Sequence, residues 1–203
     1  DASHHFYVTE KNRTDVKNGS VLKIYLNAER QVSDILNILR TGSLTEQSNC
    51  FKNLMVLSTD QTFAIEFINK SGLDLVIKVI EDEKCTGDRL EHALRSFVEL
   101  MEHESVSWEI LGDAFVNRNI AFINPPFLSN HIIEASLSIL ENIIQNSTRA
   151  GLVENSVTFE CLLELLRKPV AAIQQNTIAL VNALFTRFDD TKRRTIASTF
   201  STK

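Results

Sequence analysis

Apolar residues recur along this chain at the three- to four-residue spacing that is typical of α-helices. Because about 3.6 residues make one helical turn, this spacing places the apolar side chains on one face. Similar stripes follow one another with short polar breaks, and only 6 Gly and 3 Pro interrupt them. The pattern predicts helices almost without interruption from Ala28 onward, with a weaker one over Asp189–Lys203. The first stripe consists of Val32, Ile35, Leu36 and Leu39.

Local signals indicate where several of these helices begin and end. Ser43 and Glu46 have the Ser-x-x-Glu spacing of a capping box, in which each side chain binds an otherwise unpaired backbone N–H. Gly72 follows a short apolar stripe, and a residue without Cβ can adopt the left-handed conformation that ends a helix. We therefore expect a tight helix–Gly–helix corner at this glycine. Trp108 is predicted to lead a helix that ends before Pro125, because proline cannot continue one.

The helical pattern itself repeats along the chain. The order apolar-x-x-apolar-apolar begins at Phe51, Phe97, Leu140 and Val181, which gives spacings of 46, 43 and 41 residues. These spacings fall in the window of about 40–47 residues that armadillo and HEAT repeats occupy. One helical hairpin cannot bury its own apolar face, whereas stacked copies cover one another. We therefore predict a mainly α-helical, armadillo/HEAT-like repeat stack over residues 28–203, in preference to an irregular bundle.

The first 27 residues have a different pattern. The short runs His5–Val8 and Val21–Leu26 favour β-strands, and the polar stretch Thr9–Ser20 between them carries an Asn18–Gly19 turn signal. Two strands alone are only marginally stable in water. The composition also changes abruptly where the helical pattern begins. Either these strands lean on the helical body, or they are the end of a small domain whose beginning is missing. The change of composition favours the second, so we interpret residues 1–27 as a short β hairpin-like remnant of such a domain.

Composition and charge exclude several classes of function. Hydrophobic residues make up 43% of the chain and charged residues 23%, which is typical of a globular domain. The 21 Lys and Arg against 26 Asp and Glu give a net charge of −5, which repels phosphate and argues against nucleic-acid binding. No apolar run approaches the roughly 18 residues of a transmembrane helix. The start at Asp1 and the lack of a signal peptide indicate an excerpt of a longer chain, and three scattered cysteines fit the reducing environment of an intracellular protein.

The motifs of the common enzyme classes are absent from the sequence. It contains no G-x-x-x-x-G-K-[ST], G-x-G-x-x-G, G-x-S-x-G or H-E-x-x-H, so we expect no catalytic residue, no cofactor and no metal. Glu99 and His103 stand four residues apart without a third ligand at a matching spacing, and we interpret them as an exposed ion pair. Cys50 and Cys161 lie in apolar runs and are expected in the core. Cys85 lies in a polar loop, and we expect it to be the exposed cysteine.

Basic residues provide the candidate partner-binding sites. A mixed-charge loop in the first 27 residues and a short basic run near the end both carry cations that an acidic partner would attract, although a solvated surface is the default for either. Trp108 is the only Trp, and although such a residue often anchors an interface, we expect it in the core beside Val106. The candidate residues are Lys11, Arg13, Lys17, Lys192, Arg193 and Arg194.

Several long strings of the sequence, taken in order, resemble the ELMO (engulfment and cell motility) family. The string FYVTEKNRTDVKNGSVLKI, Phe6–Ile24, is similar to the closing strands of that family's N-terminal ubiquitin-like domain. Three later strings, Thr62–Val76, Phe97–Glu109 and Asn176–Phe185, are similar to its armadillo-like region. The resemblance implies that residues 1–27 are the C-terminal part of a ubiquitin-like, Ras-binding-type domain. It also implies that the armadillo-like domain that follows is truncated at its C-terminus.

The resemblance implies a regulatory scaffold and not an enzyme. ELMO proteins support a DOCK-type exchange factor that activates Rac, and so promote actin remodelling, cell migration and engulfment of apoptotic cells. Their ubiquitin-like domain binds an active Rho-family GTPase such as RhoG. Their armadillo-like region takes part in autoinhibition with the C-terminal half of the same chain. We therefore expect protein partners, and a cytoplasmic protein recruited to the plasma membrane through them.

Two other interpretations stay open at the level of sequence. The chain could be a generic armadillo or HEAT adaptor that binds a peptide or a partner helix along its groove. It could also be an unrecognised hydrolase that uses Cys85 or the Glu99/His103 pair. A separate structural expectation concerns Leu100, which we place in the packed seam between neighbouring repeats.

Overall fold

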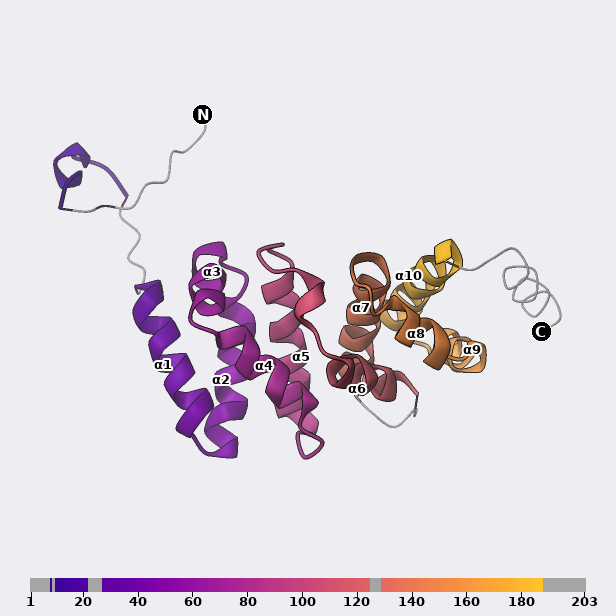
Figure 1. The fold of residues 1–203 in the computed structure, drawn as a ribbon. Coiled ribbons are helices and arrows are strands. Elements are labelled where there is room, and N and C mark those ends of the chain that lie inside the picture. Colours follow the sequence, from indigo (N-terminus) through magenta and orange to yellow (C-terminus); the bar gives the residue numbers. More distant parts are fainter. Residues whose placement is uncertain (1–7, 9, 22–26, 125–128, 188–203) are drawn as a thin grey trace.

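The computed structural model describes residues 8, 10–21, 27–124 and 129–187. In this part of the chain the helices follow one another along an elongated row, from α1 at one end to α9 and α10 at the other (Figure 1). The α-helices are α1 (Ala28–Thr41), α2 (Leu44–Leu57), α3 (Gln61–Asn69), α4 (Gly72–Glu81), α5 (Gly87–Met101), α6 (Asp113–Ile123), α7 (Asn130–Asn146), α8 (Ala150–Ser156), α9 (Phe159–Arg167) and α10 (Ala171–Arg187). Two 3-10 helices, η1 (Arg13–Asp15) and η2 (Trp108–Ile110), accompany them.

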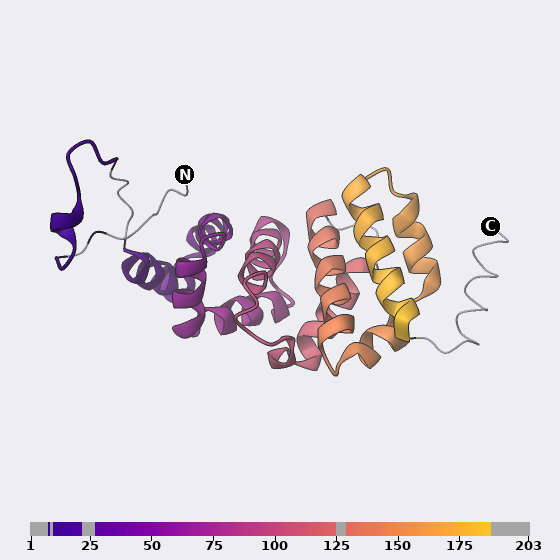
Figure 2. The same ribbon diagram turned by 90° about the horizontal axis from the view of Figure 1, so that it is seen from above.

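Four helices form one continuous layer, which we call the stacking layer: α2, α5, α7 and α10. Each packs against the next, and Figure 2 shows α7 and α10 side by side. The predicted pattern copies at Phe51, Phe97, Leu140 and Val181 fall on these four helices in turn. The first three of these residues are fully buried. The predicted repeat and the helical stack are therefore confirmed.

The remaining helices form a second layer that covers the stacking layer. Helix α4 contacts α5 and α6, helix α6 contacts α7 and α8, and α9 contacts α10. This arrangement gives three-helix repeats, α3–α5, η2–α7 and α8–α10, after a first pair, α1 and α2. A three-helix unit of this kind is the armadillo form of a helical repeat.

Hydrogen bonds between neighbouring repeats join residues one repeat length apart. The Ser96 hydroxyl donates to the Phe51 carbonyl at 3.1 Å, across 45 residues of sequence. The Asn176 side-chain amide donates to the Glu134 carbonyl at 3.2 Å, across 42 residues. Both bonds satisfy polar groups in the seam between two helices of the stacking layer, where water has little access.

The predicted capping box is present at the start of α2. Ser43 Oγ accepts from the Glu46 backbone N–H at 3.3 Å, and the Glu46 carboxylate accepts from the Ser43 backbone N–H at 2.8 Å. The Ser43 hydroxyl also donates to the Glu46 carboxylate at 2.6 Å, and this bond together with the one from the Ser43 backbone N–H lowers the pKa of the Glu46 carboxyl, because both stabilise its charged form. Two backbone donors that the helix leaves unpaired are thus satisfied by local sequence alone.

The corner between α3 and α4 is tight, as expected, but Gly72 is not its left-handed residue. Ser71 takes that conformation, with φ of 59°, and Gly72 is the first residue of α4. A Cβ on Gly72 would lie 2.5 Å from the ring of Phe67. The glycine is therefore required by close helix–helix contact and not by its own backbone angles.

The segment around Trp108 also differs from the prediction. Trp108 belongs to the short helix η2, and α6 begins only at Asp113, because Leu111 and Gly112 are extended. Trp108 is half-buried, with its ring edge-on to that of Phe97 at a centroid distance of 5.9 Å. It therefore contacts the core from its border and does not lie inside it.

The N-terminal prediction is largely outside the described residues. The strands expected over His5–Val8 and Val21–Leu26 fall mainly on residues 1–7 and 22–26, and the described Val8 and Val21 are not in strands. The Asn18–Gly19 turn is present, with a φ of 93° at Gly19. The boundary after residue 27 stays a prediction. The weak helix expected after residue 188 and the Pro125–Pro126 segment also lie outside the described residues.

Candidate protein-binding surface

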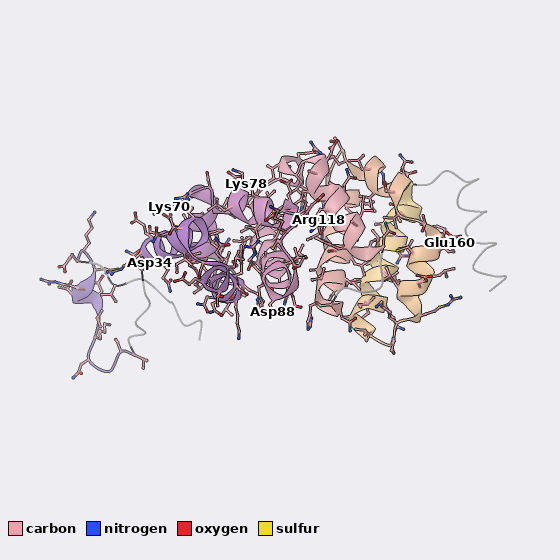
Figure 3. The ribbon with its side chains drawn as sticks, turned by 90° about the horizontal axis from the view of Figure 1, so that it is seen from below. Asp34, Lys70, Lys78, Asp88, Arg118 and Glu160 are labelled. Atoms are coloured by element: carbon pink, nitrogen blue, oxygen red, sulfur yellow. The ribbon has the colours of Figure 1, made fainter. Side chains whose placement is uncertain are left out.

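Three of the six predicted basic residues lie in the part of the chain that the structure describes. Lys11, Arg13 and Lys17 are exposed, and the Arg13 guanidinium pairs with the exposed Glu10 carboxylate at 3.2 Å. Such exposed pairs contribute little free energy, so the loop stays a mixed-charge, solvated surface. Along the rest of the row, charges of both signs are spread over several helices, as the labelled side chains in Figure 3 show. Lys192, Arg193 and Arg194 lie outside the described residues.

The expectation that Cys85 is exposed is wrong. The Cys85 side chain is fully buried. Its backbone N–H donates to the Asp82 carbonyl at 2.9 Å, and Arg89 Nε lies 3.3 Å from its sulfur. Burial raises the pKa of the Cys85 thiol, although Arg89 acts in the opposite direction. Cys50 and Cys161 are buried as expected, and burial raises the pKa of each thiol to about 11. All three sulfurs are therefore protonated, weak nucleophiles at neutral pH.

Glu99 and His103 do not form the expected ion pair. His103 Nε2 lies 2.6 Å from the carbonyl oxygen of Ser58, so the imidazole joins the end of α5 to the end of α2. Over the described ranges, no three His, Cys, Asp or Glu side chains gather closely enough to hold a metal ion. The pair offers no ligand set to a metal, and the hydrolase interpretation has no support from this geometry.

A cleft of about 480 Å³ opens between α5 and α7. The loop from α5 to η2 closes one side of it, and α7 contributes a polar stripe with a spacing of four residues. Such a volume is in the usual range for ligand-binding clefts. The lining residues are Val98, Met101, Glu102, Glu104, Val106, Ser107, Trp108, Ser138, Asn142 and Asn146.

The wall of this cleft is held firmly by the repeat that follows. The Glu109 carboxylate, next to Trp108, accepts from the Thr148 backbone N–H at 2.6 Å and from its hydroxyl at 2.8 Å. These bonds, with Arg149 at 3.6 Å, lower the pKa of Glu109. Arg149 also binds Asp113 at 2.9 Å, at the start of α6. The loop that carries Trp108 is thus fixed at its far end.

The charged residues of the cleft lining are two glutamates. Glu102 caps the C-terminal end of α5, and Glu104 has a left-handed backbone with φ of 52°. Within the described part of the chain, neither carboxylate takes part in a hydrogen bond or an ion pair. The cleft therefore combines one large aromatic ring, an apolar wall and two uncompensated negative charges.

Sequence reasoning missed this cleft, although two signals for it are present. Trp108 was assigned to the core on local context. Along α7, Ser138, Asn142 and Asn146 form a polar stripe. That stripe, together with a single Trp in a polar connection, is the pattern that points to an open border between two repeats.

A second hollow, of about 450 Å³, lies between α1 and α3. The exposed Ile65 lines it, and Lys70 pairs with two carboxylates of the lining, Glu29 at 3.4 Å and Glu66 at 3.1 Å. Because Lys70 already neutralises part of this negative charge, the hollow offers less to a cationic partner than the cleft beside Trp108 does. Among the described helices, none has both the length and the apolar character required to cross a membrane.

Comparison with known proteins relates this geometry to one family. Residues 62–203 match the family model described as ELMO, armadillo-like helical domain. The chain is 33% identical to human Engulfment and cell motility protein 1 over 214 aligned residues, which cover 99% of the chain and 29% of the relative. It is 35% identical to bovine Engulfment and cell motility protein 3 over 182 residues, covering 89% and 28%. The chain thus spans less than a third of the length of these relatives.

Designed armadillo repeat proteins are among the solved structures with a similar fold. A designed armadillo repeat protein, YIII(Dq)4CqI, superposes with a TM-score of 0.54 at 14% identity, over 75% of this chain and 64% of its own. Another designed armadillo repeat protein, solved in complex with the peptide (KR)4, gives a TM-score of 0.52 at 13% identity, over 75% and 64%. At this level of identity the likeness concerns the fold alone.

Proposed function

Because this chain belongs to the ELMO family and carries its armadillo-like helical domain, we propose that it is part of a non-enzymatic regulatory scaffold that supports a DOCK-type exchange factor. In this role the whole protein promotes activation of Rac, and through it actin remodelling, cell migration and engulfment of apoptotic cells. The observation that carries the proposal is the match to Engulfment and cell motility proteins along nearly the whole chain.

The repeat stack suits a scaffold. Consecutive repeats bury one shared core, so the row of helices holds its surfaces at fixed positions relative to one another. In the described residues all three cysteines are buried, and His103 bridges the ends of α5 and α2. Binding, with chemistry carried out by partners, is the role that this arrangement supports.

The N-terminal residues are proposed to contribute to recognition of an active Rho-family GTPase such as RhoG. Residues 1–27 would complete the ubiquitin-like domain together with a preceding segment, and Lys11, Arg13 and Lys17 would steer an acidic GTPase surface. Lys192, Arg193 and Arg194 are proposed to contact an acidic partner or the C-terminal half of the protein in its autoinhibited state. Recruitment from the cytoplasm to the plasma membrane would then follow from these partners.

The GTPase proposal is tested with the full-length protein and with a truncation that starts at Ala28. Full-length protein is expected to retain RhoG loaded with a non-hydrolysable GTP analogue and to bind the GDP form weakly, and the truncation is expected to lose most of this binding. Equal retention of both nucleotide forms would contradict the proposal. If the truncation instead kept a peptide or helix partner at full affinity, the generic adaptor interpretation would be favoured.

A charge-reversal set separates specific steering from net charge. Lys11→Glu, Arg13→Glu and Lys17→Glu together should reduce the association rate with the GTPase roughly tenfold at low salt. A control with equal charge change uses three exposed lysines of the helical body: Lys52→Glu, Lys78→Glu and Lys84→Glu. Equal loss in both sets would show that the loop has no special role. Co-precipitation of the DOCK-type exchange factor and Rac-GTP loading in cells test the scaffold role separately.

A further inference from the structure

The cleft between α5 and α7 has the chemistry of a site for a cationic side chain. Trp108 and the apolar wall provide a surface for a flat, weakly hydrated cation, and Glu102 and Glu104 provide negative charge that no other described residue neutralises. We propose that this cleft binds an arginine side chain from a basic segment of a partner protein. The proposal goes beyond the scaffold role above, which assigns no partner to this face.

Arginine fits the lining better than other side chains do. Trp is the strongest aromatic partner for a cation, and a guanidinium stacks on it readily. The apolar side chains of Val98, Met101 and Val106 suit the three methylene groups of arginine. A guanidinium has five N–H donors and no acceptor. Acceptors are what the cleft offers.

The hydrogen bonds of the lining support this assignment. Asn142 donates through Nδ2 to the Ser138 carbonyl at 3.0 Å, which leaves its Oδ1 as an acceptor. Together with the Glu102 and Glu104 carboxylates it gives three acceptor groups around one cleft. An anionic or purely apolar ligand would bury these groups without partners, which costs free energy.

The charged groups near the cleft do not cancel its field. Arg149 is already paired with Glu109 and Asp113. Arg95, seven residues before Glu102 on α5, is exposed, and Glu99 lies between them in sequence with the opposite sign. The cleft therefore stays negative toward an approaching partner, and association with a basic segment should weaken as salt is raised.

The position of Trp108 allows a direct binding test, because it is the only Trp in the sequence. The probe is the peptide acetyl-Gly-Ser-Arg-Ser-Arg-Gly-amide, titrated into the 203-residue protein while Trp emission is recorded. The matched control replaces both arginines with citrulline, which keeps the shape and removes the charge. We expect saturable change in emission with the arginine peptide and at least about tenfold weaker binding of the citrulline peptide.

Variants then assign the binding to the cleft, measured by anisotropy of a fluorescein-labelled peptide. Glu102→Gln with Glu104→Gln should weaken binding roughly five- to tenfold, since two exposed charge pairs are lost. The matched control is Glu160→Gln with Glu164→Gln on α9, near the other end of the row (Figure 3), and should leave binding unchanged. Trp108→Leu should abolish binding of the peptide. The thermal melting curve of this variant is recorded to show that it folds.

Several outcomes would overturn the proposal. Equal affinity for the arginine and citrulline peptides would show that the charge of the arginine plays no role. Equal losses of peptide affinity in the Glu102/Glu104 and Glu160/Glu164 variants would show that only the net charge of the protein matters. A tenfold gain in peptide affinity on deleting residues 188–203 would assign the cleft to the chain's own basic run instead of a partner. None of these results depends on GTPase or DOCK binding, so failure here and failure of the scaffold role are distinguishable.

Discussion

The interior helices of the stack and its last helix carry the same apolar pattern, but the same position is buried in the interior and exposed in the last helix. Leu94 of α5, Leu137 of α7 and Ile178 of α10 occupy equivalent positions, 43 and 41 residues apart. The two leucines are 0% exposed, whereas Ile178 is 51% exposed. Helices α5 and α7 each pack against a helix of the stacking layer on both sides, but α10 has α7 on one side only within the described residues.

The comparison teaches that burial here is supplied by the neighbouring repeat and not by the helix itself. An amphipathic helix in a repeat protein presents one apolar stripe to the preceding unit and another to the following one. The free energy of a substitution should therefore depend on how many neighbours its helix has. Two predictions test this difference, and two smaller ones test the close contact at Gly72 and the burial of the thiols.

The largest effect is expected for Leu100→Asp in the interior. Leu100 is fully buried on α5, so the variant places an unpaired charge in the core, with a loss of unfolding free energy on the order of several kcal/mol. Urea denaturation followed by circular dichroism measures this loss. An unchanged transition would contradict our placement of the seam.

A matched pair of truncations compares the interior with the end directly. Leu137→Ala should cost about 2–5 kcal/mol, because it removes buried methyl groups and leaves a cavity. Ile178→Ala, at the equivalent exposed position, should cost about 0.5 kcal/mol. Chemical denaturation of both variants gives the two values, and equal losses would show that position in the stack does not matter.

Two glycines provide the third test. Gly72→Ala should destabilise by about 1–3 kcal/mol, because its Cβ would meet the fully buried ring of Phe67 at 2.5 Å. Gly151→Ala in α8 is the control: a Cβ there meets nothing within 4 Å, and the variant should stabilise by about 0.5–1 kcal/mol. The melting temperature should fall for Gly72→Ala and rise for Gly151→Ala, relative to the unsubstituted protein.

The smallest effect concerns the buried thiols. The folded-state pKa of Cys50 and of Cys161 is about 11, against a value of 9.0 without burial. A raised folded-state pKa means that the unfolded state releases the proton first, so stability is full below pH 9 and falls as pH rises toward 11. The variant with Cys50→Ala and Cys161→Ala should lose less stability over this range. An identical pH profile for both proteins would contradict the assignment.

The sequence was sufficient for the features that depend on local spacing. The stripe Val32–Leu39, the Ser43–Glu46 capping box and the repeat register were all predicted correctly, because each is set by residues within one or two turns or by a recurring period. Features that depend on contacts between separate segments of the chain were not predicted correctly. Gly72 is required by Phe67, and Cys85 is covered through the side chain of Arg89.

The sequence did not predict the candidate site, because this site also depends on contacts between separate segments of the chain. The cleft is assembled from the end of α5, the connection to η2 and one face of α7, and no local pattern brings these together. His103 likewise binds a carbonyl 45 residues earlier rather than the carboxylate four residues before it. Periodicity predicts which face of a helix is buried, but it does not say where two neighbouring faces leave a gap.

Native-state hydrogen exchange, measured residue by residue on the 203-residue protein, tests the central claim most directly. If each repeat is stabilised by its neighbours, the amides of α5 and α7 should exchange only through large opening events, with much higher protection than those of α10. The same measurement on Leu137→Ala should lower protection in α7 and in the helices on both sides of it. Uniform protection from α1 to α10 would instead indicate one closed bundle and would contradict the account.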